Sequence, residues 1–189
     1  MDTALMKLAL DQFEGHLAEV GERWGWPTPC SEWDVRALCN HLLGEVLWVP
    51  SLMEGKTIDE VGDRFDGNVV GDEPVANWRA AAADALAAAS EADADTRTVH
   101  LSFGDFPGSY YLHQVTSDVI IHTWDLAKAL GADTTLDPST LAFADDELTP
   151  QVDAWRNAGV FGPPVAPAGD DRQNRLMCAT GRDPDWSAG

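Results

Sequence analysis

The chain has 189 residues, of which 44% are hydrophobic and eight are tryptophan, a composition that predicts one folded domain rather than a disordered tail. Its 32 acidic and 12 basic residues give a formal net charge of −20, which repels phosphate backbones and anionic lipids. We therefore expect neither nucleic acid nor membrane among its partners. Acidic residues interrupt the N-terminal stretch MDTALMKLALDQFEGHL, where a secretory signal would need an apolar core, so we expect a cytoplasmic protein.

Two amphipathic helices are predicted in the first part of the chain. Apolar residues at spacings of three and four predict a helix over 5–20. A second apolar stripe predicts another helix, with Ser31 as its N-cap. Because a glycine costs only about 1 kcal/mol inside a helix, we expect this helix to continue through Gly44 as far as Trp48, just before Pro50.

The middle of the chain alternates between loop, helix and strand patterns. Residues 55–74 are rich in Gly and Asp and predict a long connection, whereas 75–95 is a strong helix former with small side chains. Residues 98–103 alternate polar and apolar side chains, which is typical of a short strand or hairpin. The next helix, over 109–130, is apolar around most of its circumference, so we expect it to be the most buried.

A further helix is predicted over 138–158, and a Pro- and Gly-rich linker with a short terminal helix follows it. Long helices with little strand predict an all-α fold, a four-helix bundle over 1–160. We expect residues 161–189 to pack on this bundle as a small C-terminal extension. Facing helices of such bundles commonly build metal or ligand sites in the core.

One face of the 109–130 helix carries a polar pair. Asp118 and His122 are four residues apart, so both side chains point to the same side of the helix, among apolar neighbours. An acid and an imidazole on an apolar face are costly unless they bond to each other or share a cation. His41, on the second helix, is the best candidate for a third ligand. Glu45, one turn further on, is either a fourth ligand or a base that relays protons.

The same residues also admit plainer interpretations. Asp118 and His122 can form a buried hydrogen bond while His41 makes an unrelated contact, and from spacing alone this interpretation is favoured. His100 and His113 are interpreted as structural histidines. Core packing is the simplest explanation for the helix-facing tryptophans, although any that reach the site would form an apolar wall: Trp33, Trp48, Trp78 and Trp124.

The spacing of the cysteines and the absence of known catalytic motifs restrict the classes of reaction that the chain can carry out. The cysteines are odd in number and widely spaced, which predicts free thiols: Cys30, Cys39 and Cys178. Cys30 has no partner at the sequence level that would make it a nucleophile. The sequence contains no GxSxG, P-loop, GxGxxG or CxxC motif, so α/β-hydrolase and nucleotide-binding functions are excluded.

Several longer motifs together resemble a known family. They are TPCSEWDVRALCNHLLGE, TSDVIIHTWDLAKALG, VGDRFDG, RTVHLSFGDF and VFGPPV, and they extend over nearly the whole chain. They resemble the N-terminal domain group of the actinobacterial mycothiol-dependent maleylpyruvate isomerases, within the DinB-like superfamily. The resemblance implies a DinB-like four-helix bundle that holds a divalent metal, zinc or nickel, by His41, Asp118 and His122.

The resemblance also implies a reaction class. Members of this superfamily are linked to low-molecular-weight thiols, which a metal can activate because coordination lowers the pKa of a thiol. We therefore expect a mycothiol-dependent transferase or isomerase-like enzyme whose partners are a small thiol, mycothiol, and a small electrophile. The alternative is a non-catalytic metal- or ligand-binding bundle of the stress-response type. Under this alternative the protein is compatible with a homodimeric state.

Two departures from the isomerase pattern shape these expectations. The isomerases have Glu where this chain has Asp118, and the shorter side chain alters the ligand position. They also carry a further C-terminal domain, where this chain has only residues 161–189. We therefore expect a related reaction rather than maleylpyruvate isomerisation itself.

Overall fold

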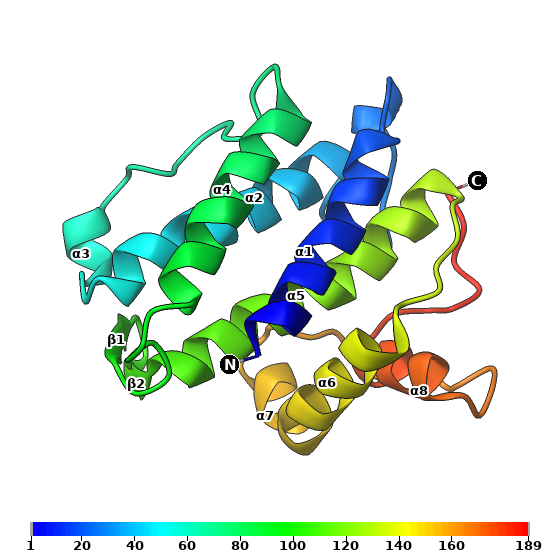
Figure 1. Ribbon diagram of the computed structural model, residues 1–189. Coiled ribbons are helices and arrows are strands. Elements are labelled where there is room, and N and C mark those ends of the chain that lie inside the picture. The colour runs from blue at the N-terminus through cyan, green and yellow to red at the C-terminus, as the bar shows by residue number, and fades with distance from the viewer. Residues whose placement is uncertain (1, 189) are drawn as a thin grey trace.

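The computed structural model describes residues 2–188 and is a helical bundle with a short hairpin (Figure 1). Its body consists of four long helices: α1 (Thr3–Ala18), α2 (Val35–Met53), α4 (Pro74–Ala89) and α5 (Gly108–Leu130). Helices α1 and α2 each pack against both α4 and α5, which closes the bundle around one core. The predicted all-α four-helix bundle is confirmed.

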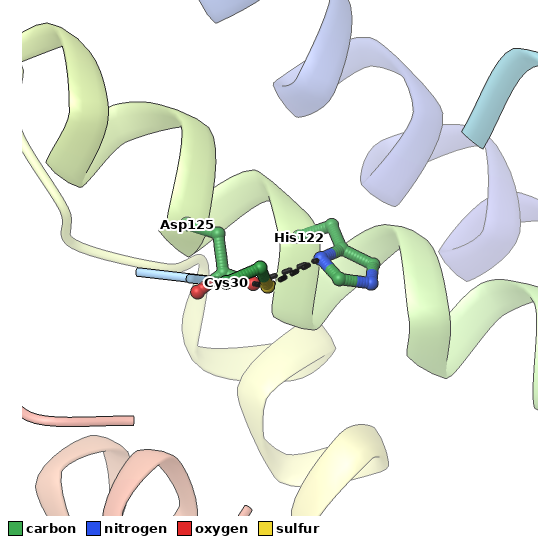
Figure 2. A group of neighbouring side chains, drawn as sticks. All are labelled: Cys30, His122 and Asp125. Atoms are coloured by element: carbon green, nitrogen blue, oxygen red, sulfur yellow. Dashed lines mark hydrogen bonds and ion pairs between the residues drawn. The ribbon is translucent and has the colours of Figure 1, made fainter. Parts of the chain in front are cut away.

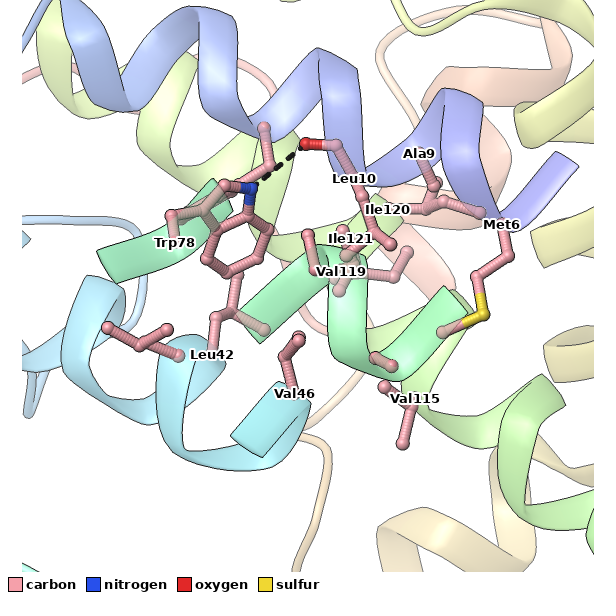
Figure 3. Packing of buried hydrophobic residues seen from close by; sticks show 14 of the residues in the cluster. Met6, Ala9, Leu10, Leu42, Val46, Trp78, Val115, Val119, Ile120 and Ile121 are labelled. Carbon is pink, nitrogen blue, oxygen red and sulfur yellow. Dashed lines mark hydrogen bonds between the residues drawn. The ribbon is translucent and has the colours of Figure 1, made fainter. Parts of the chain in front are cut away.

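The core forms where the apolar stripes of these four helices meet (Figure 3). Phe13 and Trp78 pack with ring centroids 4.4 Å apart, and the indole Nε1 of Trp78 donates a hydrogen bond to the carbonyl oxygen of Leu10 at 3.2 Å. In α5, 17 of the 23 residues are buried, as expected from its nearly continuous apolar surface. The left-handed Gly131, at φ +64°, ends this helix.

Helix α2 differs from the prediction at both ends. Its N-cap is Asp34, whose carboxylate accepts a hydrogen bond from the amide of Ala37 at 2.8 Å, so the prediction of Ser31 as N-cap is wrong. At the other end, the helix continues past Trp48 and through Pro50 to Met53. A proline inside a helix costs about 3 kcal/mol. Burial of the following side chains, Leu52 and Met53 among them, offsets this cost.

The connection after α2 contains a short helix, and the predicted strand is part of a hairpin. A single helical turn, α3 (Ile58–Val61), interrupts the connection, and a 3₁₀ turn, η1 (Arg23–Gly25), precedes α2. Strands β1 (Thr98–Leu101) and β2 (Gly104–Pro107) form an antiparallel hairpin that leads directly into α5. The prediction of a short strand or hairpin is confirmed.

The predicted helix over 138–158 is broken. The structure has α6 (Pro138–Leu148), a 3₁₀ turn η2 (Thr149–Gln151) and α7 (Val152–Asn157). Pro150 lies in the turn, and because proline has no amide hydrogen and fixes its own φ, it interrupts a continuous helix.

The last helix, α8 (Arg172–Ala179), packs against α6 and buries Leu176, Met177 and Cys178. Figure 1 shows α6, α7 and α8 together on one side of the bundle, next to α5. The division of the chain at residue 160 stays a prediction. None of the helices within residues 2–188 has the length and apolar character that a membrane span requires.

Candidate metal centre and adjoining cavity

The three side chains predicted as metal ligands come together between α2 and α5. His41 Nε2 lies 2.9 Å from Asp118 Oδ2, and His122 Nε2 lies 3.4 Å from Asp118 Oδ1. One donor atom of each side chain is within 4.8 Å of the donor atoms of the other two. Two imidazole nitrogens and a carboxylate oxygen are a donor set that zinc and similar divalent ions accept. The residues therefore fit a divalent ion in chemistry and spacing.

The electrostatics of the cluster also call for a positive charge. Desolvation disfavours the charged form of Asp118, but His122 and His41 together hold the pKa of its carboxyl well below the usual range. Desolvation likewise disfavours the imidazolium of His122, yet Asp118 and Asp125 raise the pKa of His122 well above its ordinary value. The charge of Asp118 is thus balanced by the imidazolium of His122 or by a cation in its place.

The other ring nitrogen of His122, Nδ1, is held by a hydrogen bond to Asp125. Its Nδ1 lies 2.8 Å from Oδ2 of Asp125, three residues further along α5 (Figure 2). Burial raises the pKa of Asp125, but Arg182 and His122 outweigh it and lower that pKa to about 2. An ionised carboxylate only accepts hydrogen bonds, so Nδ1 carries the proton. In the neutral ring this leaves the Nε2 lone pair directed toward Asp118.

Arg182, from the segment after α8, holds Asp125 in place. Its guanidinium Nη2 donates to Asp125 Oδ2 at 2.9 Å, and Nε lies 3.3 Å from both carboxylate oxygens. Another nitrogen donates to the carbonyl oxygen of Thr180 at 3.0 Å. Asp125 is completely buried and Arg182 nearly so. The arrangement is a chain of contacts from Arg182 through Asp125 to His122.

Cys30 lies beside the candidate metal centre, although no sequence pattern connected it to His122 or Asp125. Its thiol donates to Asp125 Oδ2 at 3.3 Å, and Sγ lies 3.9 Å from His122 Nδ1 (Figure 2). Sγ also lies 3.7 Å from Arg182 Nη2. Cys30, His122 and Asp125 thereby form a second group with metal-ligand spacing. The position of Asp125 three residues after His122 could have predicted their contact from the sequence, because residues i and i+3 share a helix face. Nothing in the sequence linked Cys30 or Arg182 to this place.

A cavity of about 570 Å³ adjoins the metal-ligand cluster, and His41, Asp118 and Glu45 line it. Glu45 lies outside the three-residue donor group. Burial and the nearby charge of Asp118 raise the pKa of Glu45, while His41 and His122 lower it in part. Glu45 is therefore a carboxyl that can hold a proton more readily than an exposed one.

The tryptophans divide between the core and the site. Trp78 and Trp124 are buried in the core. Trp33 packs on the cluster, with its ring centroid 4.6 Å from that of His41 and 5.4 Å from that of His122. Trp48 lines the cavity.

The two histidines interpreted as structural each have an acidic partner. His100 Nδ1 lies 2.7 Å from Asp105 Oδ1 within the hairpin. His113 Nδ1 lies 3.1 Å from Glu147 Oε1, and both of these residues line the cavity. His113 thus both pairs with Glu147 and lines the cavity beside the candidate site.

Comparison with known proteins assigns the bundle to a family. The profile of the mycothiol maleylpyruvate isomerase N-terminal domain matches residues 6–127, and the chain belongs to this family. Two uncharacterized proteins of Mycobacterium tuberculosis, from strains CDC 1551 / Oshkosh and ATCC 25618 / H37Rv, are each 37% identical to it over 135 residues. The alignments cover 69% of this chain and 68% of each relative. No solved structure matches the chain significantly.

Proposed function

We propose that the protein is a metal-dependent enzyme that uses a low-molecular-weight thiol, mycothiol, in a transferase or isomerase-like reaction on a small electrophile. The observation that supports this most is that His41 and Asp118 belong both to the donor group and to the wall of the 570 Å³ cavity. A site that combines metal ligands with a ligand-sized cavity is suited to chemistry. Membership of a mycothiol-related family supports the choice of thiol.

The proposal places a divalent ion, zinc or nickel, on His41, Asp118 and His122. The alternative group of Cys30, His122 and Asp125 is disfavoured because the guanidinium of Arg182 already lies 2.9 Å from Asp125 and 3.7 Å from the Cys30 sulfur. A second cation there would meet this fixed positive charge.

The chain's own residues supply the remaining functions. A divalent ion, when bound, lowers the pKa of a coordinated thiol. Asp125 fixes the ring orientation of His122, and Trp33 covers both imidazoles on one side. Glu45, with its raised pKa, holds or accepts a proton at the cavity wall.

The test is the metal content and thiol response of protein purified without a metal-affinity tag. We expect about one divalent ion per chain in the wild type, and loss of the ion in His41→Ala and His122→Ala with helix content retained. His113→Ala is the matched control, because His113 lines the same cavity but lies outside the donor group. Stoichiometric metal in His122→Ala would contradict the ligand assignment.

The thiol is then tested on cobalt(II)-substituted protein. Mycothiol should produce a sulfur-to-cobalt charge-transfer band, and the same band should appear in Cys30→Ser, which removes the nearby protein thiol as its source. Bound cobalt without a response to mycothiol would instead favour a non-catalytic metal-binding bundle.

A further inference from the structure

The cavity beside the candidate metal centre is elongated along two helices. On α5 it is lined by both Tyr110 and Asp118, which lie about 12 Å apart along the helix axis at about 1.5 Å per residue. On α2 it is lined by His41 and, about two and three turns further on, by Trp48 and Leu52. The cavity therefore has one end at the metal-ligand cluster, which we call the metal end, and another near the hairpin.

Aromatic rings gather at the end near the hairpin. Phe106 of β2 stacks on Tyr110 with ring centroids 4.5 Å apart, and Phe103 packs on Phe106 at 5.1 Å. Phe103 also contacts Trp155 of α7, at 6.3 Å and nearly at a right angle. Phe103, Tyr110 and Trp155 all line the cavity, and we call this group the aromatic end. Three segments that are separate in the sequence thus contribute rings to it.

Polar side chains that also line the cavity already have contacts within the chain. His113 Nδ1 lies 3.1 Å from Glu147 Oε1, and His113 lies only three residues after Tyr110 on α5. The amide of Gln151 donates to the carbonyl oxygen of Glu147 at 2.8 Å. These contacts reduce the polar surface that this part of the cavity offers to a ligand, whereas the faces and edges of the rings stay available.

Phe103 is 56% exposed although it lines the cavity. A large ring in water forgoes the free energy that burial would provide. The cavity volume of about 570 Å³ lies within the range of sites for small organic molecules. A partner chain seated on Phe103 would leave the interior of the cavity unfilled, whereas a small molecule with an apolar body would cover the ring and fill the cavity.

We propose that the electrophile carries an aromatic group that binds at the aromatic end and directs its reactive group toward the metal end. Contacts between aromatic rings add binding free energy beyond that of the buried area. The role of this ligand as electrophile rests on the proposed function, whereas the binding of its aromatic group rests on the cavity alone. Trp155 lies outside residues 6–127, the segment that matches the family profile, so this specificity is set partly by a residue that the family match does not cover.

The aromatic end is tested first with a probe that needs no metal. N-phenyl-1-naphthylamine is a neutral aromatic molecule whose fluorescence increases in an apolar site. We expect saturable binding of about one probe per chain to metal-depleted and to metal-loaded protein. Absence of saturable binding to either form would overturn the proposal.

A substitution at the exposed ring locates the probe. Phe103→Ser should weaken probe binding by at least about fivefold, because the ring no longer contacts the ligand. Leu8→Ser is the matched control, since Leu8 is also exposed, at 37%, but lies on α1 outside the cavity wall. Equal affinity in wild type and Phe103→Ser would overturn the proposal. A wild-type dimer that Phe103→Ser converts to monomer in sedimentation would do the same, because a second copy would then cover the ring.

Competition between two alcohols tests the preference for an aromatic group. Benzyl alcohol and cyclohexylmethanol differ only in the ring, and benzyl alcohol is the less hydrophobic of the two. We expect benzyl alcohol to displace the probe at a concentration about two- to tenfold lower. Displacement by cyclohexylmethanol at an equal or lower concentration would overturn the preference.

The same measurements separate this inference from the proposed function. Probe binding and the aromatic preference in a protein that binds neither metal nor mycothiol would leave the aromatic end standing and remove the enzymatic role. Binding of metal and mycothiol without binding of the probe would do the reverse.

Discussion

Asp125 governs the orientation of a candidate metal ligand without lining the cavity itself. It accepts the Nδ1 proton of His122 at 2.8 Å and is completely buried. Carboxylates that hold a ligating imidazole in this way fix its tautomer and increase its basicity, and their loss typically lowers metal affinity 10–100-fold.

Asp125→Asn should therefore weaken metal binding by about 10–100-fold while leaving the three proposed ligands in place. Competition with a chromophoric chelator measures the change, at a temperature where both proteins are folded. Asp105→Asn is the control, since it alters another Asp–His contact, that of His100 at 2.7 Å, in the hairpin. Unchanged metal affinity in Asp125→Asn would show that His122 does not need this contact or is not a ligand.

Arg182 and Asp125 form a buried ion pair, and such pairs are costly to break on one side. Arg182→Met leaves the Asp125 carboxylate buried without its guanidinium partner, so we expect a loss of about 3–5 kcal/mol in the free energy of unfolding. Urea denaturation followed by circular dichroism measures this loss. The exposed Arg79, which pairs with Glu14 on the surface, is the control, and Arg79→Met should change stability little. A similar small effect for both variants would contradict the importance of the buried pair.

At the scale of elements, the junction between the hairpin and α5 depends on a glycine. A Cβ added at Gly108 would collide with the backbone carbonyl oxygen of Ala94 and lie 3.0 Å from Met53 Cε. Gly108→Ala should therefore lower the free energy of unfolding by about 1–3 kcal/mol, as overpacking does. Gly44→Ala, inside α2 with nothing within 4 Å of the new Cβ, should raise it by about 0.5–1 kcal/mol. Chemical denaturation of both variants measures these opposite shifts, and two shifts of the same sign would contradict the packing argument.

The helices were predictable to the extent that local signals determine them. The apolar period and Gly131 placed α5 closely, because both are signals carried by residues that are close together in the sequence. The start of α2 was mispredicted because Ser31 and Asp34 are both good N-caps. The loop before the helix selects Asp34 through the bridge between Pro27 and Asp34, a contact that spacing does not reveal.

The candidate site shows the same limit. The spacing of Asp118 and His122 on one helix placed them together, and the helix faces placed His41 opposite them. Cys30 and Arg182 are 152 positions apart in the chain and meet only because the segment after α8 returns to α5. Helix periodicity could therefore identify the candidate metal ligands on α2 and α5. It could not identify Cys30 and Arg182, which lie in loop segments and come together beside these ligands only in the folded chain.

At the scale of the whole molecule, the formal charge of −20 opposes compaction. Surface ion pairs such as that of Lys7 with Asp11 contribute little, because both side chains are more than half exposed. Salt screens repulsion among the remaining acidic groups, since the Debye length falls from about 10 Å at 0.1 M to about 3 Å at 1 M.

Thermal stability should therefore rise with salt. For a chain of this size, each 1 kcal/mol of relieved repulsion raises Tm by about 2–4 °C. Melting followed by circular dichroism in sodium chloride and in potassium chloride from about 0.05 to 0.5 M measures the effect, and both salts should act alike because screening depends on ionic strength. A falling Tm would mean that the attractive pairs outweigh the repulsion. A rise with only one of the two cations would point to specific ion binding by the acidic surface instead of screening.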